Sequence, residues 1–177
     1  MHSDLQLINE FIFKPAGFEI SNIETELESL EYSAQTFRLG QHKVKFRTAK
    51  ITPTKTGQFV TLWKRNSQGI TEPHNFSDDF DFYIIATRTD SQFGIFIFQK
   101  AVLHENCILS DNFREGKRGF RVYPPWDSTI NKQAQKTQIW QINYFLELTQ
   151  AKTIDLQKTF VLLTTKKASI SRGLINY

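Results

Sequence analysis

Two stretches of mostly apolar residues constrain the fold of this chain more than any other feature. The segments "DFYIIATR" (81–88) and "FGIFIFQKAVL" (93–103) are apolar at neighbouring rather than alternate positions, and they are rich in β-branched and aromatic side chains. This composition is typical of strands that are covered on both faces. The two segments therefore predict the centre of a β-sheet with helices flanking it.

The short connection between these segments predicts how they pair. Only "TDSQ" separates them, which is short enough for a hairpin. If Asp90 and Ser91 are the two central turn residues, paired positions sum to 181, and Asp81 then faces Lys100. Gly94 could mark a bulge in the second strand.

Two further strands are predicted upstream, and both carry bases. In "HKVKFRTAK" (42–50), Val44 and Phe46 alternate with basic residues, so a strand would bury the apolar pair and project Lys43, Lys45 and Arg47 from one face. "QFVTLWKR" (58–65) repeats the pattern and ends in two bases. The intervening "TPTKTG" predicts a turn, because proline presets φ and glycine accepts positive φ.

Helical spacing appears near both ends of the chain. "SDLQLINEFIF" (3–13) offers Ser3 as an N-cap and apolar residues at helical intervals. The longest predicted helix runs from 129 to 148, capped by Asp127 or Ser128. Its inward side is predicted to carry Ile139, Trp140, Ile142, Phe145 and Leu146, while Lys132 and Lys136 share an outer face.

Charge is segregated along the sequence. Residues 1–31 hold seven acids (Asp4, Glu10, Glu19, Glu24, Glu26, Glu28, Glu31) against one base, Lys14. Residues 32–71 then hold eight bases (Arg38, Lys43, Lys45, Arg47, Lys50, Lys55, Lys64, Arg65) and no acid. A face that only solvates the protein normally mixes both signs. The basic zone therefore favours an anionic ligand.

A second basic zone interleaves cations with aromatic residues. In "REGKRGFRVYPPWD" (114–127), Phe120, Tyr123 and Trp126 alternate with three bases, Lys117, Arg118 and Arg121. Cations that contact phosphates beside rings that stack on bases are the usual equipment of nucleic-acid surfaces.

Several classes of protein are disfavoured. No stretch reaches the roughly 18 apolar residues of a membrane helix, and no secretion signal is evident, so we expect a cytoplasmic protein. The single cysteine, Cys107, excludes an internal disulfide and is expected to be a buried or unreactive thiol, and the four histidines are too dispersed for zinc. No phosphate-binding glycine motif or nucleophile elbow is present, and no cofactor is expected.

Four segments in order, "FRTAKITPTKTGQFVTLWKRN", "SDDFDFYIIATRT", "EGKRGFRVYPPWD" and "NKQAQKTQIWQ", resemble the MepB family of bacterial proteins. The family is named for its association with genes for a multidrug efflux pump. The resemblance implies a cytoplasmic protein with a core similar to that of type II restriction endonucleases, and hence a leaning toward nucleic acid. We predict one domain, 1–177, that consists of an acidic helical region (1–30), a core matching the family (31–148) and an extension (149–177).

A nuclease site of that fold needs an acid on one strand and an acid-x-Lys group on the next, where the acids hold Mg²⁺. Asp79 or Asp81 could supply the first acid and Lys100 the lysine, but Phe98 stands where the second acid belongs. Without it, a magnesium-dependent nuclease is only an alternative, and catalysis is not favoured. A second alternative is an adaptor or regulator linked to efflux, whose acidic residues 19–31 engage a basic partner or the chain's own basic groove.

The sequence therefore predicts a non-catalytic nucleic-acid-binding protein of low sequence specificity, for DNA or RNA, with an α+β fold. Its core is a mixed, largely antiparallel sheet flanked by helices. The predicted contact residues are Lys45, Arg47, Lys50, Lys55, Lys64, Arg65, Lys117, Arg118, Arg121, Tyr123, Trp126, Lys132 and Lys136.

Overall fold

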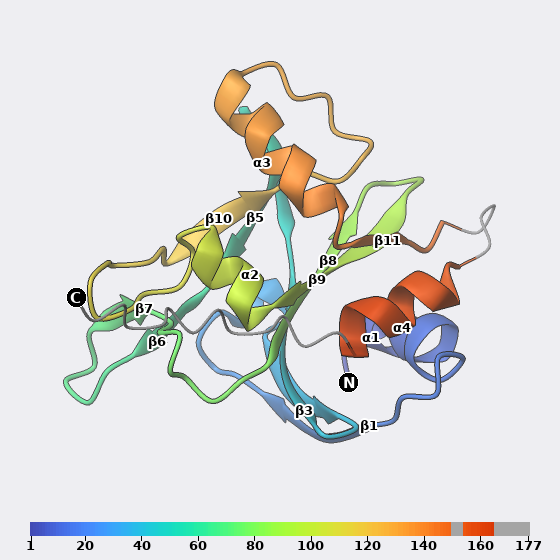
Figure 1. The fold of residues 1–177 in the computed structure, drawn as a ribbon, viewed down its shortest axis with the longest axis horizontal. Coiled ribbons are helices and arrows are strands. Elements are labelled where there is room, and N and C mark those ends of the chain that lie inside the picture. The colour runs from blue at the N-terminus through green and yellow to red at the C-terminus, as the bar shows by residue number, and fades with distance from the viewer. Residues whose placement is uncertain (150–153, 165–177) are drawn as a thin grey trace, which may run out of the picture.

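The structure is a computed structural model that describes residues 1–149 and 154–164. Its main sheet has six strands in the order β1-β2-β3-β8-β9-β11 (Figure 1). β3 and β8 run parallel, and the other neighbouring pairs are antiparallel. These strands span Ile20–Thr25 (β1), Gln35–Leu39 (β2), His42–Thr48 (β3), Phe82–Arg88 (β8), Phe93–Gln99 (β9) and Phe145–Glu147 (β11). The predicted α+β fold with a mixed, largely antiparallel sheet is confirmed.

A second sheet of three strands, in the order β10-β5-β4, packs over the main sheet. A two-stranded ribbon, β6-β7, lies between β5 and β10 in the chain. The strands span Lys50–Thr52 (β4), Lys55–Thr61 (β5), Trp63–Arg65 (β6), Thr71–Pro73 (β7) and Gly119–Val122 (β10). The turn predicted in "TPTKTG" connects β4 to β5.

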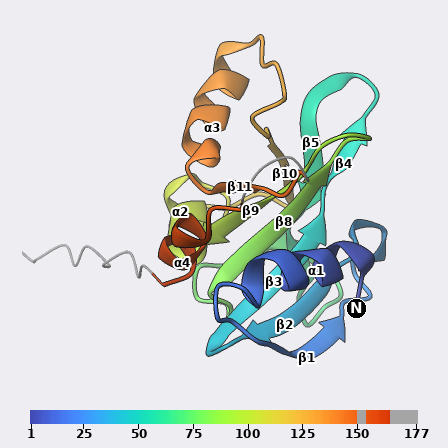
Figure 2. The same cartoon turned by 90° about the vertical axis from the view of Figure 1, so that its right-hand side faces the viewer.

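Helices cover both faces of the main sheet. α1 and α4 pack on one face, as Figures 1 and 2 show, while α2 and the second sheet pack on the other. The helices span Ser3–Ile8 (α1), Lys100–Glu105 (α2), Lys132–Ile142 (α3) and Leu156–Thr164 (α4), with a π-helical turn at Asn9–Phe13 (η1) and a 3-10 turn at Leu30–Tyr32 (η2). No helix in the described ranges is both long and apolar enough to span a membrane.

Residues of β8 and β9 contribute alternately to two hydrophobic cores. Ile84 and Ile97 are buried beneath α1 and α4, whereas Tyr83 and Phe98 are buried beneath the second sheet. The central strands are therefore apolar at consecutive positions because both of their faces are covered, as the sequence predicts.

The predicted hairpin register is confirmed. Phe82 pairs with Gln99, and Arg88 pairs with Phe93, so paired positions sum to 181. Thr89 N–H donates to the Gln92 carbonyl at 2.9 Å and closes a turn around Asp90 and Ser91. The β8–β9 pairing continues through Gly94 without a register shift, so this glycine marks no bulge.

The longest predicted helix is wrong in extent. α3 begins after Asn131, whose side chain accepts the Ala134 N–H at 2.7 Å, rather than after Asp127 or Ser128. It ends at residue 142, because Phe145 and Leu146 leave the helix and pair with β9 as strand β11. An unpaired strand edge and an apolar core outweigh local helical spacing here.

The prediction of which side of α3 faces inward is also wrong. Its buried residues are Ala134 and Gln141, whereas Ile139 is 70% exposed and Ile142 is 37% exposed. Gln141 Nε2 donates to the Arg121 carbonyl, and Gln141 Oε1 accepts the Tyr123 N–H. The helix therefore docks through amide hydrogen bonds. Trp140 packs against Phe98, as predicted.

The ends of the chain differ in part from the prediction. The helical part of residues 1–30 stops at residue 13, because Ile20–Thr25 forms the edge strand β1. Within the 149–177 extension, α4 docks through Leu162 and Leu163, while residues 150–153 and 165–177 lie outside the described residues.

Cys107 is exposed, not buried, and it has an unusual backbone conformation. It follows α2 with φ 59°, and the N–H groups of Cys107 and Ile108 donate to the carbonyls of His104 and Leu103. This is a Schellman end, in which glycine is favoured because it adopts positive φ without strain. We expect Cys107→Gly to raise the free energy of unfolding by about 1 kcal/mol in urea denaturation. A stability equal to or below that of the wild type would contradict this.

Candidate functional site

The outer face of the second sheet carries a row of basic and aromatic side chains that crosses all three strands. In the strand register, Lys50 of β4 pairs with Phe59 of β5, which pairs in turn with Arg121 of β10. The inner residues of the same strands, such as Val60 and Phe120, are buried in the core, so this row faces away from it. We call the Lys50–Phe59–Arg121 row, with Lys55 and Tyr123, the outer basic face.

Arg121 is held in place without losing its charge. Its guanidinium donates to the carbonyl of Gly57 at 3.0 Å and to Thr52 Oγ1 at 2.6 Å, and its carbon lies 5.9 Å from the Phe59 ring centroid. These acceptors are neutral, so the positive charge is oriented but not cancelled. Lys55 is exposed beside it and makes no ion pair with the residues that the structure describes.

Two glycines allow aromatic rings to lie close to the backbone on this face. A Cβ added to Gly57 would lie 2.5 Å from Tyr123 Cε1, and one added to Gly119 would lie 2.5 Å from Phe59 Cζ. The rings of Tyr123 and Phe59 therefore occupy space that other residues would fill. Both rings are partly exposed.

A pair of glycine variants tests this close packing. Gly57 and Gly69 both have positive φ, 84° and 78°, but nothing lies within 4 Å of a Cβ added to Gly69. We expect Gly57→Ala to lower the free energy of unfolding by about 2 kcal/mol and Gly69→Ala by about 1 kcal/mol, since only the former adds a clash with Tyr123 to the backbone strain. Equal losses in urea denaturation would show that the Tyr123 contact is unimportant.

Lys50 lies at the other end of the row. Its Nζ is 3.0 Å from Glu31 Oε2 and 4.7 Å from the Tyr32 ring centroid, and the Tyr32 ring packs edge-on against Phe59 at 6.3 Å. This ion pair is exposed, so it holds Lys50 only weakly.

The prediction that β3 projects three bases from an open face holds for Lys43, which is 40% exposed, but is wrong for the other two. Arg47 is 1% exposed and Lys45 is 15% exposed, and both contact the carboxylate of Glu26. Burial opposes ionisation of Glu26, but the adjoining Arg47 and Lys45 outweigh it and lower the pKa of Glu26. The sequence left open whether acidic residues 19–31 engage a basic partner or the chain's own basic groove, and the structure places Glu26 against the bases of β3.

A second, partly buried network holds Lys64. Asp78 Oδ1 lies 2.6 Å from Lys64 Nζ, and Asp78 Oδ2 lies 2.8 Å from His74 Nδ1 and accepts the Asn75 N–H at 3.0 Å. Burial, with a smaller effect of Lys45, lowers the pKa of His74 to about 4. His74 is therefore neutral at pH 7, and its Nδ1–H donates to Asp78.

The remaining predicted bases are divided: Arg65 and Arg118 lie at the β6–β7 ribbon, whereas Lys132 and Lys136 lie on α3 (Figure 1). Arg118 contacts Glu115 at 2.9 Å and the Thr71 carbonyl at 3.1 Å, and Arg65 lies 5.3 Å from the Trp63 ring centroid. Arg118 borders an open groove of about 560 Å³ between the ribbon and residues 110–115, where Phe113 is 97% exposed. Lys117, Lys132 and Lys136 are exposed.

Trp126 does not suit the predicted stacking role. It is partly buried, and its ring packs at 5.3 Å against Phe145 of the core. Tyr123 is therefore the ring of this segment on the outer basic face. Phe59 was missed, because alternation alone does not tell which side of a strand faces outward. Tyr32 packs edge-on against Phe59 but is buried.

The residues of the nuclease alternative do not converge. Asp79 is exposed and contacts Lys43, while Asp81 accepts the Lys43 N–H at 2.9 Å. The Lys100 N–H donates to the Asp81 carbonyl, as the register implies, but Lys100 Nζ donates to the Asp78 carbonyl. No group of three potential metal ligands occurs in the described part of the chain.

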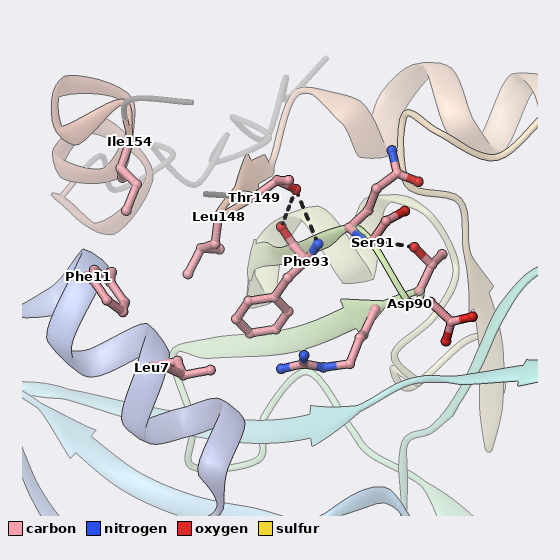
Figure 3. Close-up of a pocket in the computed structure, with 11 residues that line it drawn as sticks. Leu7, Phe11, Asp90, Ser91, Phe93, Leu148, Thr149 and Ile154 are labelled. Carbon is pink, nitrogen blue, oxygen red and sulfur yellow. Dashed lines mark hydrogen bonds between the residues drawn. The ribbon is translucent and has the colours of Figure 1, made fainter. Parts of the chain in front are cut away.

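A further groove of about 650 Å³ lies between α1 and the β8–β9 turn (Figure 3). Leu7, Phe11, Phe93, Leu148 and Ile154 line it, and the turn residues border one end. Arg88 lies 4.3 Å from the Phe93 ring centroid and contacts Asp4. None of the predicted contact residues lies there.

The fold and these surfaces define an α+β protein in which a small basic sheet is layered on a large mixed one. The chain belongs to the MepB-like family, whose model matches residues 26–147. It is similar to the crystal structure of MepB, with 33% identity and a TM-score of 0.73 over 83% of this chain and 97% of that chain. A bacterial homing endonuclease is 14% identical, with a TM-score of 0.42 over 78% of this chain and 85% of that one, too low to support an argument. No curated protein matches.

Proposed function

We propose that this protein binds single-stranded nucleic acid through the outer basic face, with low sequence specificity and without cleaving it. The observation that carries the proposal is the register row of Lys50, Phe59 and Arg121 across three strands, with Tyr123 and Lys55 beside it. Cations on this row would contact phosphates, while the partly exposed rings would stack on unpaired bases.

A single-stranded ligand suits this surface better than a duplex. Bases in a duplex are stacked on one another, so rings on a sheet surface reach them only when they are unpaired. Reading of the major groove usually requires a helix with an extended basic face, but α3 has eleven residues and only two bases, Lys132 and Lys136, both in its first half. The cytoplasm, where we expect the protein, supplies such strands.

A binding titration tests the proposal. We would measure fluorescence anisotropy of labelled single- and double-stranded DNA and RNA at several salt concentrations, with and without Mg²⁺. Binding to single strands should be tighter than to duplexes and should weaken steeply with salt. Absence of binding at low salt would overturn the proposal. Cleavage in Mg²⁺ that Asp81→Ala abolishes would instead favour the nuclease alternative.

A further inference from the structure

The bases of β3 meet an acidic segment of the same chain. Residues 26–31, "ELESLE", cross from the end of β1 toward the second sheet, and we call them the acidic strap. At one end Glu26 contacts both Lys45 and Arg47, and at the other Glu31 contacts Lys50. Between them, Thr61 Oγ1 donates to Ser29 Oγ at 2.9 Å, which ties the strap to β5.

The Glu26 carboxylate leaves one hydrogen-bond donor of its two cations without an acceptor in the described part of the chain. Arg47 Nη1 donates to the Phe46 carbonyl and Nη2 contacts Glu26, but the buried Nε has no hydrogen-bond partner among the described residues. Nε–H and one Nη2–H lie on the same edge of a guanidinium, the edge that binds an oxyanion through two parallel hydrogen bonds. Glu26 uses only half of that edge.

Charge at this position is also unbalanced. Lys45 and Arg47, which are largely buried, face a single carboxylate, whereas Lys64 in the nearest network lies against two, those of Asp78 and Glu72. Burying an excess positive charge is costly unless a second negative charge approaches. Inorganic phosphate or a terminal phosphate monoester offers more oxygens and more charge than a carboxylate does, so it suits this arrangement better than the carboxylate that lies in it. An internal phosphodiester of a nucleic acid has one charge and two free oxygens and can replace the carboxylate one for one.

The strap is built in a way that allows it to leave. Ser29 and Ser33 adopt positive φ, 67° and 53°, which is strained for residues other than glycine. Leu27 is 79% exposed and Leu30 is 55% exposed, so the apolar side chains of the strap contribute little burial. Beyond its ion pairs, the strap is held by the Thr61–Ser29 hydrogen bond and by the Glu26 N–H, which donates to the Ala34 carbonyl at 2.9 Å.

We propose that Lys45 and Arg47 form a phosphate-binding site that Glu26 occupies in this structure, and that the acidic strap competes with a nucleic-acid phosphate for it. The second part rests on the proposed function. Lys50 lies near both surfaces, since it comes two residues after the end of β3 and also belongs to the outer basic face. Displacement of the strap would free the two bases of β3, which lie on the side of the main sheet where the second sheet packs.

The site itself is tested with inorganic phosphate and Glu26→Gln. Glu24→Gln is the matched control, because Glu24 is exposed, lies on the same strand end and makes no ion pair within the described ranges. At constant ionic strength, phosphate in place of chloride should raise the melting temperature of Glu26→Gln by several degrees and leave Glu24→Gln nearly unchanged. Equal responses of the two variants would overturn the site.

Competition is tested with labelled single strands. Glu26→Gln should bind about tenfold more tightly than Glu24→Gln, since both remove one negative charge but only the former frees two cations. If Glu26→Gln does not fold, Glu31→Gln, which frees the exposed Lys50, should still bind about threefold more tightly than Glu24→Gln. Unchanged affinity in the variants that fold would overturn competition. A phosphate response without binding of any nucleic acid would instead retain the site and reject the proposed function.

Discussion

Replacing Lys55 and Arg121 together with alanine is expected to weaken binding of single-stranded nucleic acid by about 10- to 100-fold. Each of these two cations on the outer basic face lacks an acidic partner among the described residues. Contact with one phosphate of a single strand contributes a slope of about 0.7 in a plot of log affinity against log salt. The double variant should therefore also lose about 1.4 from that slope.

A matched control separates this effect from net charge. The double variant Lys14→Ala, Arg38→Ala removes the same charge outside the second sheet. Lys14 follows η1 and contacts Glu10, and Arg38 lies on β2 and donates to the Gln41 carbonyl. Its affinity should stay within about threefold of the wild type. Because Arg121 also contacts Gly57 and Thr52, the free energy of unfolding of each variant is to be measured alongside. Equal affinity of the two double variants would contradict the role of the outer basic face.

Acid should destabilise this protein through His74 at a pH where carboxylates are still ionised. Burial lowers the pKa of His74 to about 4 in the folded chain, against about 6.5 when unfolded. Between these values the unfolded chain binds the extra proton, so stability falls as pH falls. For these two values the loss between pH 7 and pH 5 is about 2 kcal/mol.

The His74→Gln variant isolates this contribution. It keeps a polar side chain beside Asp78 but cannot titrate, so the stability difference between wild type and variant should shrink by about 2 kcal/mol from pH 7 to pH 5 in urea denaturation. The lowered pKa values of Glu26 and Asp78 also make stability fall with acid, but at lower pH, as those carboxylates become protonated. A difference that is constant over this range would show that His74 titrates normally in the folded protein.

The centre of the fold could be predicted from the sequence because its signals are local. Consecutive apolar residues marked β8 and β9, and the short connection between them set their register to the residue. The end of α3 could not be predicted in this way. Phe145 and Leu146 continue a helical pattern, and only the free edge of β9, far away in the sequence, draws them into a strand.

The candidate site could likewise be predicted only in part from the sequence. Lys50, Lys55, Arg121 and Tyr123 were named from composition, and the structure brings them together on one face with Phe59, which was not named. Lys45, Arg47 and Lys64 were named by the same reasoning, yet acids from distant segments bury or hold them. Alternation shows that bases share a side of a strand, but it does not show what covers that side.

Photo-crosslinking would show directly whether single-stranded nucleic acid binds the outer basic face. A single-stranded oligonucleotide of about a dozen nucleotides, which matches the usual site size of such surfaces, would carry thio-substituted bases that crosslink to nearby side chains. After digestion, mass spectrometry would locate the crosslinked peptides. If the strand binds the outer basic face, we expect crosslinks within residues 50–61 and 119–123, centred on Phe59 and Tyr123. Crosslinks confined to α1, α4 and the groove of Figure 3 would place the ligand on the opposite side of the main sheet and contradict it.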